Sequence, residues 1–461
     1  MKRRELVGLG GAVVLGTAVG GVDSKARDGG KIALPQPPDL SFLREGPLVN
    51  VARARQFMAN EGVDAVVVTH PGNVFYLTGH WPQLDRMGRD HTAMAILPRD
   101  PARPPVLIMQ SFLHYYTHSD ESPAGERLVF TYTTRAAAEA NATAPAGDEP
   151  LAVPPSTYRI LEESLVTPRE RSRRARVAAV RNNAAGPDWA LRNALRELKL
   201  ESATLGIDDQ DIAVMLGQVG FTARCVPGEN LMRRIRLVKS AREVQLMRIG
   251  AQLNVDAAVE AVKLVRAAGN TRVFRAAFFT AAAKRGLTPV YMVINGSSSE
   301  VMNADISEGQ AFAIDCVSSL RFYHADFART VLVGDPGTRM KTIVAATHQA
   351  WKDVRSSLRP GLRFAEVQKV GRDSLRRQGM DINISFTPHS VGLFHTDHPY
   401  PTVQDPRAVE ALRLEEGMVL SVDCPLGDTG AGGTSHLEDL SLITREGSEP
   451  IHSVPPNVFV V

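Results

Sequence analysis

Short apolar runs alternate with amphipathic stretches along the first half of the chain, a pattern typical of mixed strands and helices. A helical period extends from Leu48 to Asn60, and an apolar run from Val63 to Thr69 predicts a strand. Pro71-Gly-Asn73 interrupts this pattern before a second apolar segment. We expect further strands at residues 92–97, 106–109 and 205–208, and a loop at residues 136–156, which are rich in Ala and Pro. This half therefore predicts an α/β domain.

The second half begins with a predicted helix whose start is marked by a capping box. Ser240 and Glu243 have the spacing at which a hydroxyl and a carboxylate accept hydrogen bonds from amides at a helix start. Apolar residues follow on one face of this helix, at Val244, Met247, Ala251, Val255, Val259 and Val262. Gly269 is expected to end it. Further helices are predicted at residues 339–358 and 364–378, the second stopped by Gly379.

Asp315 and Asp326 each lie in or beside a short apolar run of strand character, eleven residues apart. Burying a carboxylate is costly unless it is paired or bound to a cation, so two that face each other suggest a metal pair. Three more candidates, His389, Asp423 and Glu438, are embedded in apolar sequence. Four carboxylates and one imidazole suit two divalent ions with bridging carboxylates. Ligand strands interleaved with helices predict an α+β domain.

Composition limits the classes of partner. The chain has 461 residues, too many for one ordinary domain, so we expect two. The net charge of +3 is small, so the composition gives no indication of a nucleic acid or an acidic partner. The densest basic stretch, residues 169–176, has no aromatic residues beside it, and we interpret it as a solvated helix face.

The three cysteines, Cys225, Cys316 and Cys424, cannot all pair within one chain, so no disulfide framework is predicted. Cys316 and Cys424 each follow a candidate ligand. Because side chains alternate along a strand, both are expected to point away from the metal and to be buried.

The N-terminus has the pattern of an export signal. Paired arginines at Arg3 and Arg4 precede an apolar run from Val7 to Val19. The run is shorter than the about 20 residues that cross a bilayer, and the paired arginines resemble a twin-arginine signal. We therefore expect a periplasmic or secreted protein without stable membrane insertion, unless the signal stays uncleaved.

Five motifs in the second half occur in one fixed order. They are Asp315; Asp326-Phe-Ala-Arg329-Thr330; His389-Ser-Val-Gly392; Gly417-Met-Val-Leu-Ser-Val-Asp423-Cys-Pro425; and Leu437-Glu438-Asp439. In order and spacing they resemble the creatinase/prolidase/methionine-aminopeptidase superfamily, the pita-bread metallohydrolases of peptidase family M24. The segment Asn73-Val-Phe-Tyr-Leu-Thr-Gly79 resembles the N-terminal domain of creatinase and prolidase.

The resemblance implies a fold, a domain plan and a ligand set. It implies a pita-bread catalytic domain at residues 233–461 and a creatinase-like N-terminal domain at residues 46–232, after a signal segment (1–26) and a linker (27–45). It implies two divalent ions (Mn, Co, Zn or Fe). Their ligands would be Asp315, Asp326, His389, Asp423 and Glu438. We expect a homodimer that acts on a peptide or another small molecule.

Several positions depart from the family pattern. Asp423 stands where the family has Glu, so the second metal ion is expected to be held weakly. His436 stands where the prolidase-like branch usually carries Arg. A second active-site His usually follows the ligand His by seven positions, where this chain has Thr396, flanked by His395 and His398. Either histidine could take that role.

Three functional hypotheses remain open at this point. In the first, a Xaa-Pro dipeptidase or aminopeptidase uses metal-activated water, His395 or His398 stabilises the oxyanion, and Glu438 or Asp423 takes the proton. In the second, the same scaffold runs a different hydrolysis or a lyase reaction. In the third, the site has decayed and only binds. The retained acids argue against the third, because stranded buried carboxylates are costly.

Overall fold

The computed structural model describes residues 34–82, 84, 92–116, 127–133, 149, 162–180, 182–295, 302–382, 384–427, 430 and 432–461. Residues 37–461 form one compact unit. The predicted signal segment and the first part of the predicted linker lie outside the described residues. Among the helices described, none has both the length and the apolar character that a bilayer crossing requires.

The first half of the compact unit is built on a seven-stranded sheet in the order β5-β4-β3-β2-β1-β6-β7. Antiparallel pairs join β1 to β2 and β2 to β3, and the other pairs are parallel. The strands are β1 (Ala65–Val68), β2 (Ala93–Pro98), β3 (Val106–Gln110), β4 (Leu128–Tyr132), β5 (Asn182–Ala184), β6 (Thr204–Ile207) and β7 (Arg224–Pro227). Every residue of β1 and β2 is buried, because helices cover both faces of the sheet.

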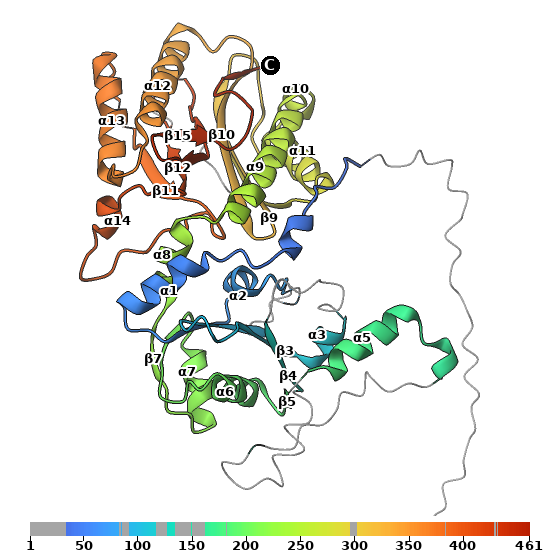
Figure 1. The fold of residues 1–461 in the computed structure, drawn as a ribbon. Helices are drawn as coiled ribbons and strands as arrows, with labels where there is room; N and C mark the ends of the chain where they lie inside the picture. The colour runs from blue at the N-terminus through green and yellow to red at the C-terminus, as the bar shows by residue number, and fades with distance from the viewer. Residues whose placement is uncertain are drawn as a thin grey trace, which may run out of the picture. The chain divides into compact units, whose positions relative to one another are not determined.

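Helices lie on each side of this sheet (Figure 1). In Figure 1, α1 (Val51–Asn60) and α2 (Pro71–Thr78) lie on one side, and α6 (Pro187–Glu197) and α7 (Asp211–Gln218) on the other. The remaining elements of this half are η1 (Ser41–Arg44), α3 (Ser111–Tyr116), η5 (Glu163–Leu165), α5 (Pro168–Ala178) and α8 (Glu229–Leu237). The predicted α/β organisation of this half is confirmed, with strands at each expected position. Helix α5 buries no residue, which confirms that the basic stretch is a solvated helix face.

The second half contains two further sheets. One has the order β13-β10-β9-β8 with β16 paired to β10, and the other has the order β11-β12-β14-β15. Their strands are β8 (Thr288–Ile294), β9 (Ala311–Leu320), β10 (Tyr323–Leu332), β11 (Thr387–Ser390), β12 (Val419–Asp423), β13 (Glu438–Asp439), β14 (Ser441–Ile443), β15 (Ser448–Pro450) and β16 (Phe459–Val460). The helices are α9 (Ala241–Val262), α10 (Val265–Ala268), α11 (Thr271–Lys284), α12 (Thr338–Ser357), α13 (Phe364–Arg377) and α14 (Ala408–Ala411).

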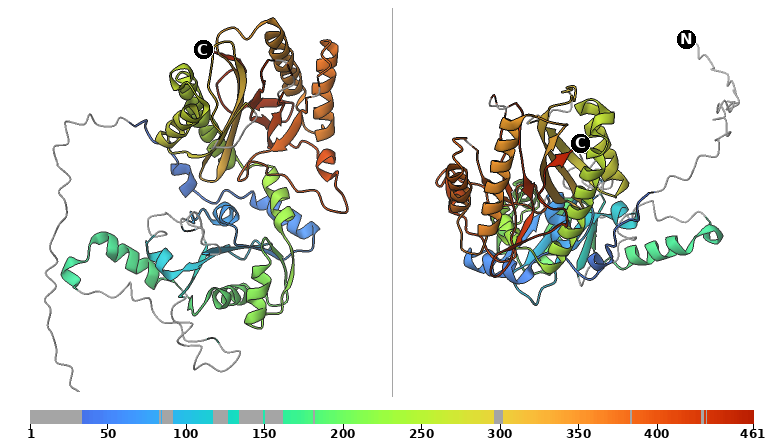
Figure 2. Two further views of the ribbon diagram at one scale, coloured as in Figure 1. Left: turned by 180° about the vertical axis from the view of Figure 1, so that it is seen from behind. Right: turned by 90° about the horizontal axis from the view of Figure 1, so that it is seen from above.

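These elements form four layers. Figures 1 and 2 show α9 and α11 against the sheet of β9 and β10, and α12 and α13 against the sheet of β11 and β12. Apolar side chains fill the space between each sheet and its helices: Phe274 and Phe278 of α11 on one side, and Trp351 of α12 and Phe364 of α13 on the other. The strands that carry the five predicted ligands, β9 to β13, therefore lie on the inner side of these helices. The predicted α+β class is confirmed.

Two helix predictions need correction. Helix α9 begins at the predicted capping box, with both Ser240 and Glu243 bonds present, but it ends at Val262. Gly269, at φ +68°, instead caps the separate short helix α10. Helix α11 was not predicted, because its face alternates alanine with aromatic residues and gives a weak apolar period. The helices predicted at residues 339–358 and 364–378 are confirmed as α12 and α13. The predicted domain boundary at residue 233 falls within α8 and stays a prediction.

Candidate metal centre

Three of the predicted ligands lie on one sheet, on a shared face. Asp315 of β9 is opposite Ala328 of β10, and Ala328 is opposite Glu438 of β13. Asp326 lies two residues before Ala328, so the period of two along a strand puts its side chain on the same side. The hairpin of β9 and β10 thus aligns both aspartates with Glu438, although Glu438 is more than a hundred residues further along the chain.

The other two predicted ligands lie on the facing sheet. His389 of β11 is opposite Ser421 of β12, and Asp423 follows Ser421 by two positions. His389 and Asp423 therefore project from one face, toward the first sheet.

The structure brings all five predicted residues together. The His389 Nε2 atom lies 3.5 Å from an oxygen of Asp326, 3.4 Å from one of Asp423 and 3.3 Å from one of Glu438. Asp315 joins through Glu438, because donor atoms of both lie within 4.8 Å of each other. The convergence expected from the motif order is thus present in the fold.

The tautomer of His389 suits a metal ligand. Its Nδ1 lies 3.2 Å from the carbonyl oxygen of His395, and a carbonyl only accepts, so Nδ1 carries the proton. In a neutral ring, Nε2 then presents a lone pair to three carboxylates. Such an arrangement is repulsive unless a cation lies between them, and it is the usual arrangement of a metal-binding imidazole.

The buried acids of the centre differ in how their pKa values are shifted. Burial, and then the charges of neighbouring carboxylates, raise the pKa values of Asp315 and Glu438 well above the usual range. Burial also acts to raise the pKa of Asp326, but the hydrogen bond and charge of His395 outweigh it and lower that pKa to about 2. Buried acids of this kind are costly without a counter-charge.

Several carboxylate oxygens at the centre are left without hydrogen bonds. Among the residues described, Asp315 Oδ1, Glu438 Oε2 and Asp326 Oδ1 have no hydrogen-bond partner, whereas Asp326 Oδ2 has the His395 ring nitrogen 3.0 Å away. Buried oxygens normally have partners, so each unpartnered one points to a missing ligand. Oxygen donors, an imidazole lone pair and these unpartnered atoms all fit divalent cations.

Arg329 fixes the backbone on which Glu438 sits. Its buried guanidinium donates to the Glu438 carbonyl at 3.0 Å and pairs with Asp439 at 2.7 Å. The Arg-Thr part of the sequence motif is therefore a structural clamp between β10 and β13. Thr330 extends the clamp by hydrogen bonds to the backbone of His436.

The two candidate histidines have different surroundings. The Nε2 atom of His395 lies 3.0 Å from Asp326 and 2.9 Å from the hydroxyl of Tyr291. Burial lowers the pKa of His395, but the hydrogen bond and charge of Asp326 outweigh it and raise the pKa above its usual value. His398 instead accepts from the Ser390 amide at 3.3 Å and packs edge-on against Phe364. The geometry places His395 at the centre and His398 behind it.

His436 was not among the predicted site residues, yet it borders the centre. Its Nε2 lies 3.4 Å from Glu438 and 3.6 Å from Asp423. In the sequence it stood out only as a departure from the family pattern, two positions before Glu438. Cys316 and Cys424 are buried and unbridged, as predicted.

A cavity of about 380 Å³ opens beside the carboxylates. Its wall includes Asp315, Asp423 and His436, together with Thr387 and Thr434. A space of this size is typical of a small-ligand site. A substrate bound here would lie directly against the candidate metal ligands.

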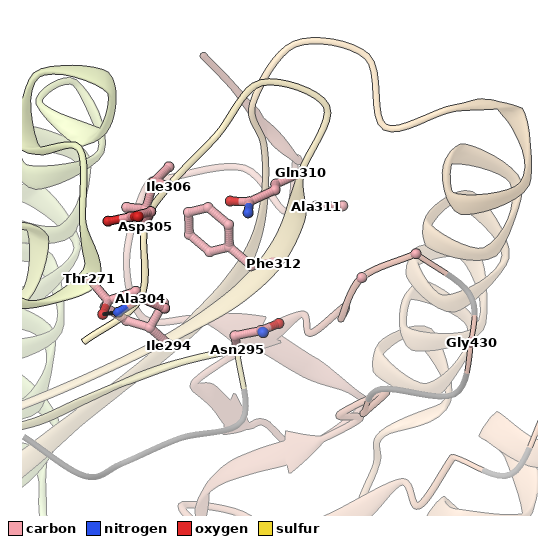
Figure 3. A pocket seen from close by; sticks show the side chains of 12 residues that line it. Thr271, Ile294, Asn295, Ala304, Asp305, Ile306, Gln310, Ala311, Phe312 and Gly430 are labelled. Carbon is pink, nitrogen blue, oxygen red and sulfur yellow. Dashed lines mark hydrogen bonds between the residues drawn. The ribbon is translucent and has the colours of Figure 1, made fainter. Parts of the chain in front are cut away.

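A second cavity, of about 490 Å³, is formed by neighbouring residues of the same strands (Figure 3). Asn295, Gln310 and Phe312 line it, and Asp305 is the one ionisable side chain among its described lining residues. It therefore lacks a donor set for a metal ion or an acid–base pair.

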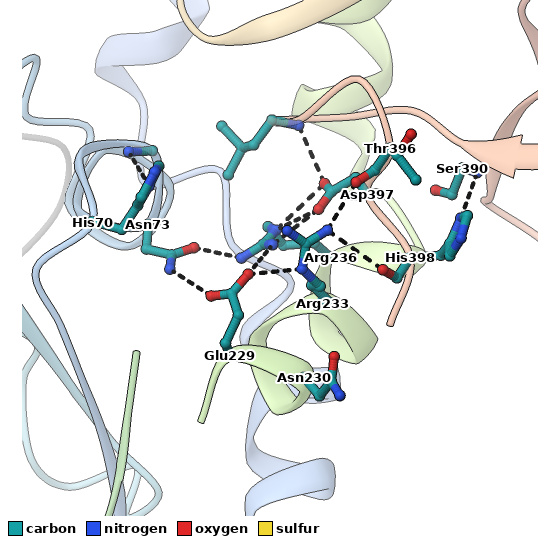
Figure 4. A network of polar contacts seen from close by, with 12 residues as sticks. His70, Asn73, Glu229, Asn230, Arg233, Arg236, Ser390, Thr396, Asp397 and His398 are labelled. Carbon is teal, nitrogen blue, oxygen red and sulfur yellow. Dashed lines mark hydrogen bonds and ion pairs between the residues drawn. The ribbon is translucent and has the colours of Figure 1, made fainter. Parts of the chain in front are cut away.

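A buried polar network holds the segment that carries His395 (Figure 4). Arg236 of α8 donates to Asp397 at 2.9 and 3.0 Å and also contacts the Asn73 side-chain oxygen. Asp397 in turn accepts from the Leu393 amide at 3.2 Å. Arg233 donates to the Thr396 carbonyl at 2.8 Å. These bonds fix the backbone on both sides of His395 and leave its ring free to face Asp326.

Two family models match the chain. Residues 232–445 match the model described as metallopeptidase family M24, and residues 50–182 match the creatinase/prolidase N-terminal domain. Together the two matched ranges include strands β1 to β4 of the N-terminal sheet and all five predicted ligands.

Curated relatives match at low identity. A probable dipeptidase PepE of Mycobacterium tuberculosis is 25% identical over 242 residues, which are 50% of this chain and 63% of that protein. A Xaa-Pro dipeptidase of Pyrococcus horikoshii is 24% identical over 230 residues, which are 48% of this chain and 64% of that protein. The matches thus span somewhat under two thirds of these relatives.

Solved structures match over most of the chain. An X-Pro aminopeptidase from Thermotoga maritima has a TM-score of 0.61 at 16% identity, over 89% of this chain and 99% of that one. A prolidase from Pyrococcus furiosus has a TM-score of 0.58 at 18% identity, over 87% and 99%. At these identities the likeness shows the fold, which is the predicted pita-bread architecture with a creatinase-like N-terminal domain.

Proposed function

Because this chain belongs to the creatinase/prolidase superfamily of M24 metallopeptidases, we propose that it hydrolyses short peptides at the centre described above. One observation carries the proposal: the carboxylate cluster with its unpartnered oxygens, which His389 joins through Nε2, contributes Asp315 and Asp423 to the wall of a substrate-sized cavity. Divalent ions bound there would supply a nucleophilic water at neutral pH and polarise the scissile carbonyl.

The proposal extends to substrates with proline after the scissile bond. It is supported by relatives and neighbours named Xaa-Pro dipeptidase, X-Pro aminopeptidase and prolidase. A cavity of about 380 Å³ suits a dipeptide or the end of a short peptide better than a folded protein.

His395 is proposed to stabilise the oxyanion. Asp326 holds its ring at 3.0 Å and raises its pKa, so the ring is a competent hydrogen-bond donor near neutral pH. The Tyr291 hydroxyl contacts the same ring nitrogen at 2.9 Å. Glu438 is proposed as the proton acceptor, because one of its oxygens has no partner in the described structure while the other accepts from Ser421.

The test is a substrate panel on protein loaded with Mn²⁺, Co²⁺, Zn²⁺ or Fe²⁺ in turn. It should contain Xaa-Pro dipeptides, Xaa-Pro tripeptides and matched Xaa-Ala peptides. We expect cleavage of Xaa-Pro bonds, and a fall in kcat of about 10²–10⁴-fold for His395→Ala without loss of metal. Metal binding without cleavage of any peptide would sink the peptidase proposal and favour a non-peptide substrate on the same scaffold.

Export is a separate proposal that rests on the paired arginines alone. The double change Arg3→Lys and Arg4→Lys is expected to leave the protein in the cytoplasm, since the twin-arginine pair is the feature that such a pathway reads. Cell fractionation measures the outcome, with Lys2→Arg as the matched control. Equal periplasmic recovery of the double variant would show that the arginines are incidental.

A further inference from the structure

His436 occupies a fixed position at the edge of the carboxylate cluster. Its backbone amide donates to Thr330 Oγ1 at 3.1 Å, and its carbonyl accepts from the same hydroxyl at 3.1 Å. The residue is 5% exposed. Its ring is therefore held in place by β10, the strand that also carries Asp326.

The Nε2 atom of His436 lies close to two carboxylates and to a backbone amide. The Cys424 amide points at His436 Nε2 over 3.3 Å, which makes Nε2 an acceptor in the neutral ring. The same atom lies 3.4 Å from Glu438 Oε2, an oxygen without a partner among the described residues. It is also 3.6 Å from Asp423 Oδ1. Without metal, the Nε2 lone pair accepts from the Cys424 amide, and a cation placed among these carboxylates would take that lone pair in its place.

Two groups of donor atoms share Glu438. One group is His389, Asp423 and Glu438, and another is Asp315, His436 and Glu438, each with ligand atoms within 4.8 Å of one another. Each group contains one imidazole. A further group, Asp326, His389 and His395, borders the first through His389.

We propose that His436 is a metal ligand, which together with Asp315 and Glu438 holds a second ion beside the one that His389, Asp423 and Glu438 would hold. Charge favours an imidazole in this position. Four carboxylates already balance two divalent ions, and a neutral imidazole adds a donor without adding charge. The second ion then no longer depends on the short side chain of Asp423, which lies 3.6 Å from His436, and we expect it to be firmly bound.

The proposal also concerns the choice of metal. Each of the two donor groups that share Glu438 contains one imidazole, so both are mixed nitrogen–oxygen sites. Such sites favour Zn²⁺, Co²⁺ or Fe²⁺ over ions such as Mn²⁺ that prefer oxygen alone. We therefore expect the centre to bind Co²⁺ and Zn²⁺ more tightly than Mn²⁺ at both positions.

The main experiment is a calorimetric titration of metal-stripped full-length protein with Co²⁺. Wild type is expected to bind two ions, and His436→Ala to bind one as tightly as wild type and the second at least about 100-fold more weakly, since even a residue that only supports a ligand contributes 10–100-fold. The visible spectrum of bound Co²⁺ should change for the second ion only. His348→Ala is the matched control, because His348 is also buried but belongs to none of the donor groups.

A second variant distinguishes the loss of a metal ligand from a loss of folding. His436→Asn keeps a side-chain acceptor for the Cys424 amide but removes the imidazole, and it should lose the second ion while keeping the wild-type circular dichroism spectrum. If His436 only supports the Cys424 backbone, His436→Asn will bind both ions with wild-type affinity. That result overturns the proposal, as does a wild-type protein that binds a single ion.

A double variant tests compensation between His436 and Asp423. His436→Arg alone should weaken the second ion, and adding Asp423→Glu should restore it, because the longer carboxylate regains the reach. If Asp423→Glu gives no recovery in the His436→Arg background, the two positions do not compensate and the proposed role is wrong. All these readouts are metal affinities, so they can succeed even if the peptidase proposal fails, and the reverse also holds.

Discussion

Glu438→Gln is expected to release both metal ions and to reduce peptide hydrolysis by about 10³-fold or more. Glu438 belongs to two of the donor groups, one with His389 and one with His436, so it is the carboxylate that the two halves share. Glutamine keeps the shape and one oxygen but carries no charge. Metal content after dialysis and kcat/KM on the best peptide measure the result.

The same change should have the opposite effect on stability when metal is absent. Glu438 is fully buried, and burial and neighbouring carboxylates raise its pKa, so the charged group destabilises the metal-free fold. Metal-free Glu438→Gln is therefore expected to melt at a higher temperature than metal-free wild type, while the order reverses with metal present. The exposed Glu410→Gln serves as control and should change neither value. Full metal content in Glu438→Gln would remove Glu438 from the ligand set.

Asp397→Ala is expected to cost about 3–5 kcal/mol of stability, the range for breaking a buried ion pair. Both Arg236 and Asp397 are 0% exposed, so the change leaves the Arg236 guanidinium buried without its principal counter-charge. The bond from the Leu393 amide is lost as well. Chemical denaturation of the metal-loaded protein measures the loss, and kcat should also fall because His395 is no longer held against Asp326.

A double variant separates the effect of an unpaired buried charge from a simple loss of packing. Replacing both partners, with Arg236→Met and Asp397→Leu, should be less destabilising than Asp397→Ala alone, because no buried charge is then left unpaired. The exposed Asp405→Ala is the matched single change and should be neutral within about 0.5 kcal/mol. A loss below about 1 kcal/mol for Asp397→Ala would mean that solvent reaches Arg236 and that the network is not structural.

Much of the fold was predictable because local signals agree with tertiary structure. The carboxylates at Asp315 and Asp326 interrupt apolar strands, and only a cation or a partner makes that tolerable in a core. The capping box at Ser240 and Glu243 marks the start of α9 correctly, since both of its bonds are local. The end of α9 was predicted wrongly, because the break after Val262 has no glycine or proline to mark it.

The less predictable parts of the site depend on long-range contacts. Sequence spacing left His395 and His398 equivalent, and only the folded segment shows that His395 reaches Asp326 while His398 turns toward Phe364. His436 was visible as a departure from the family pattern but not as a neighbour of Asp423. Its position depends on the pairing of β13 with β10, which the local sequence pattern does not predict.

The network around Arg236 determines which part of the chain would have to accompany the metal centre if it were moved to another protein. Its members include Asn73, from a helix of the N-terminal half, and Asp397, from the segment beside the metal ligands. A shortened chain that starts at residue 233 would keep every candidate ligand yet lose Asn73 and Glu229, both of which contact Arg236. Grafting the catalytic half alone onto another protein would therefore transfer the metal ligands without the support that orients His395. The smallest portable unit of this chemistry includes α2 and α8.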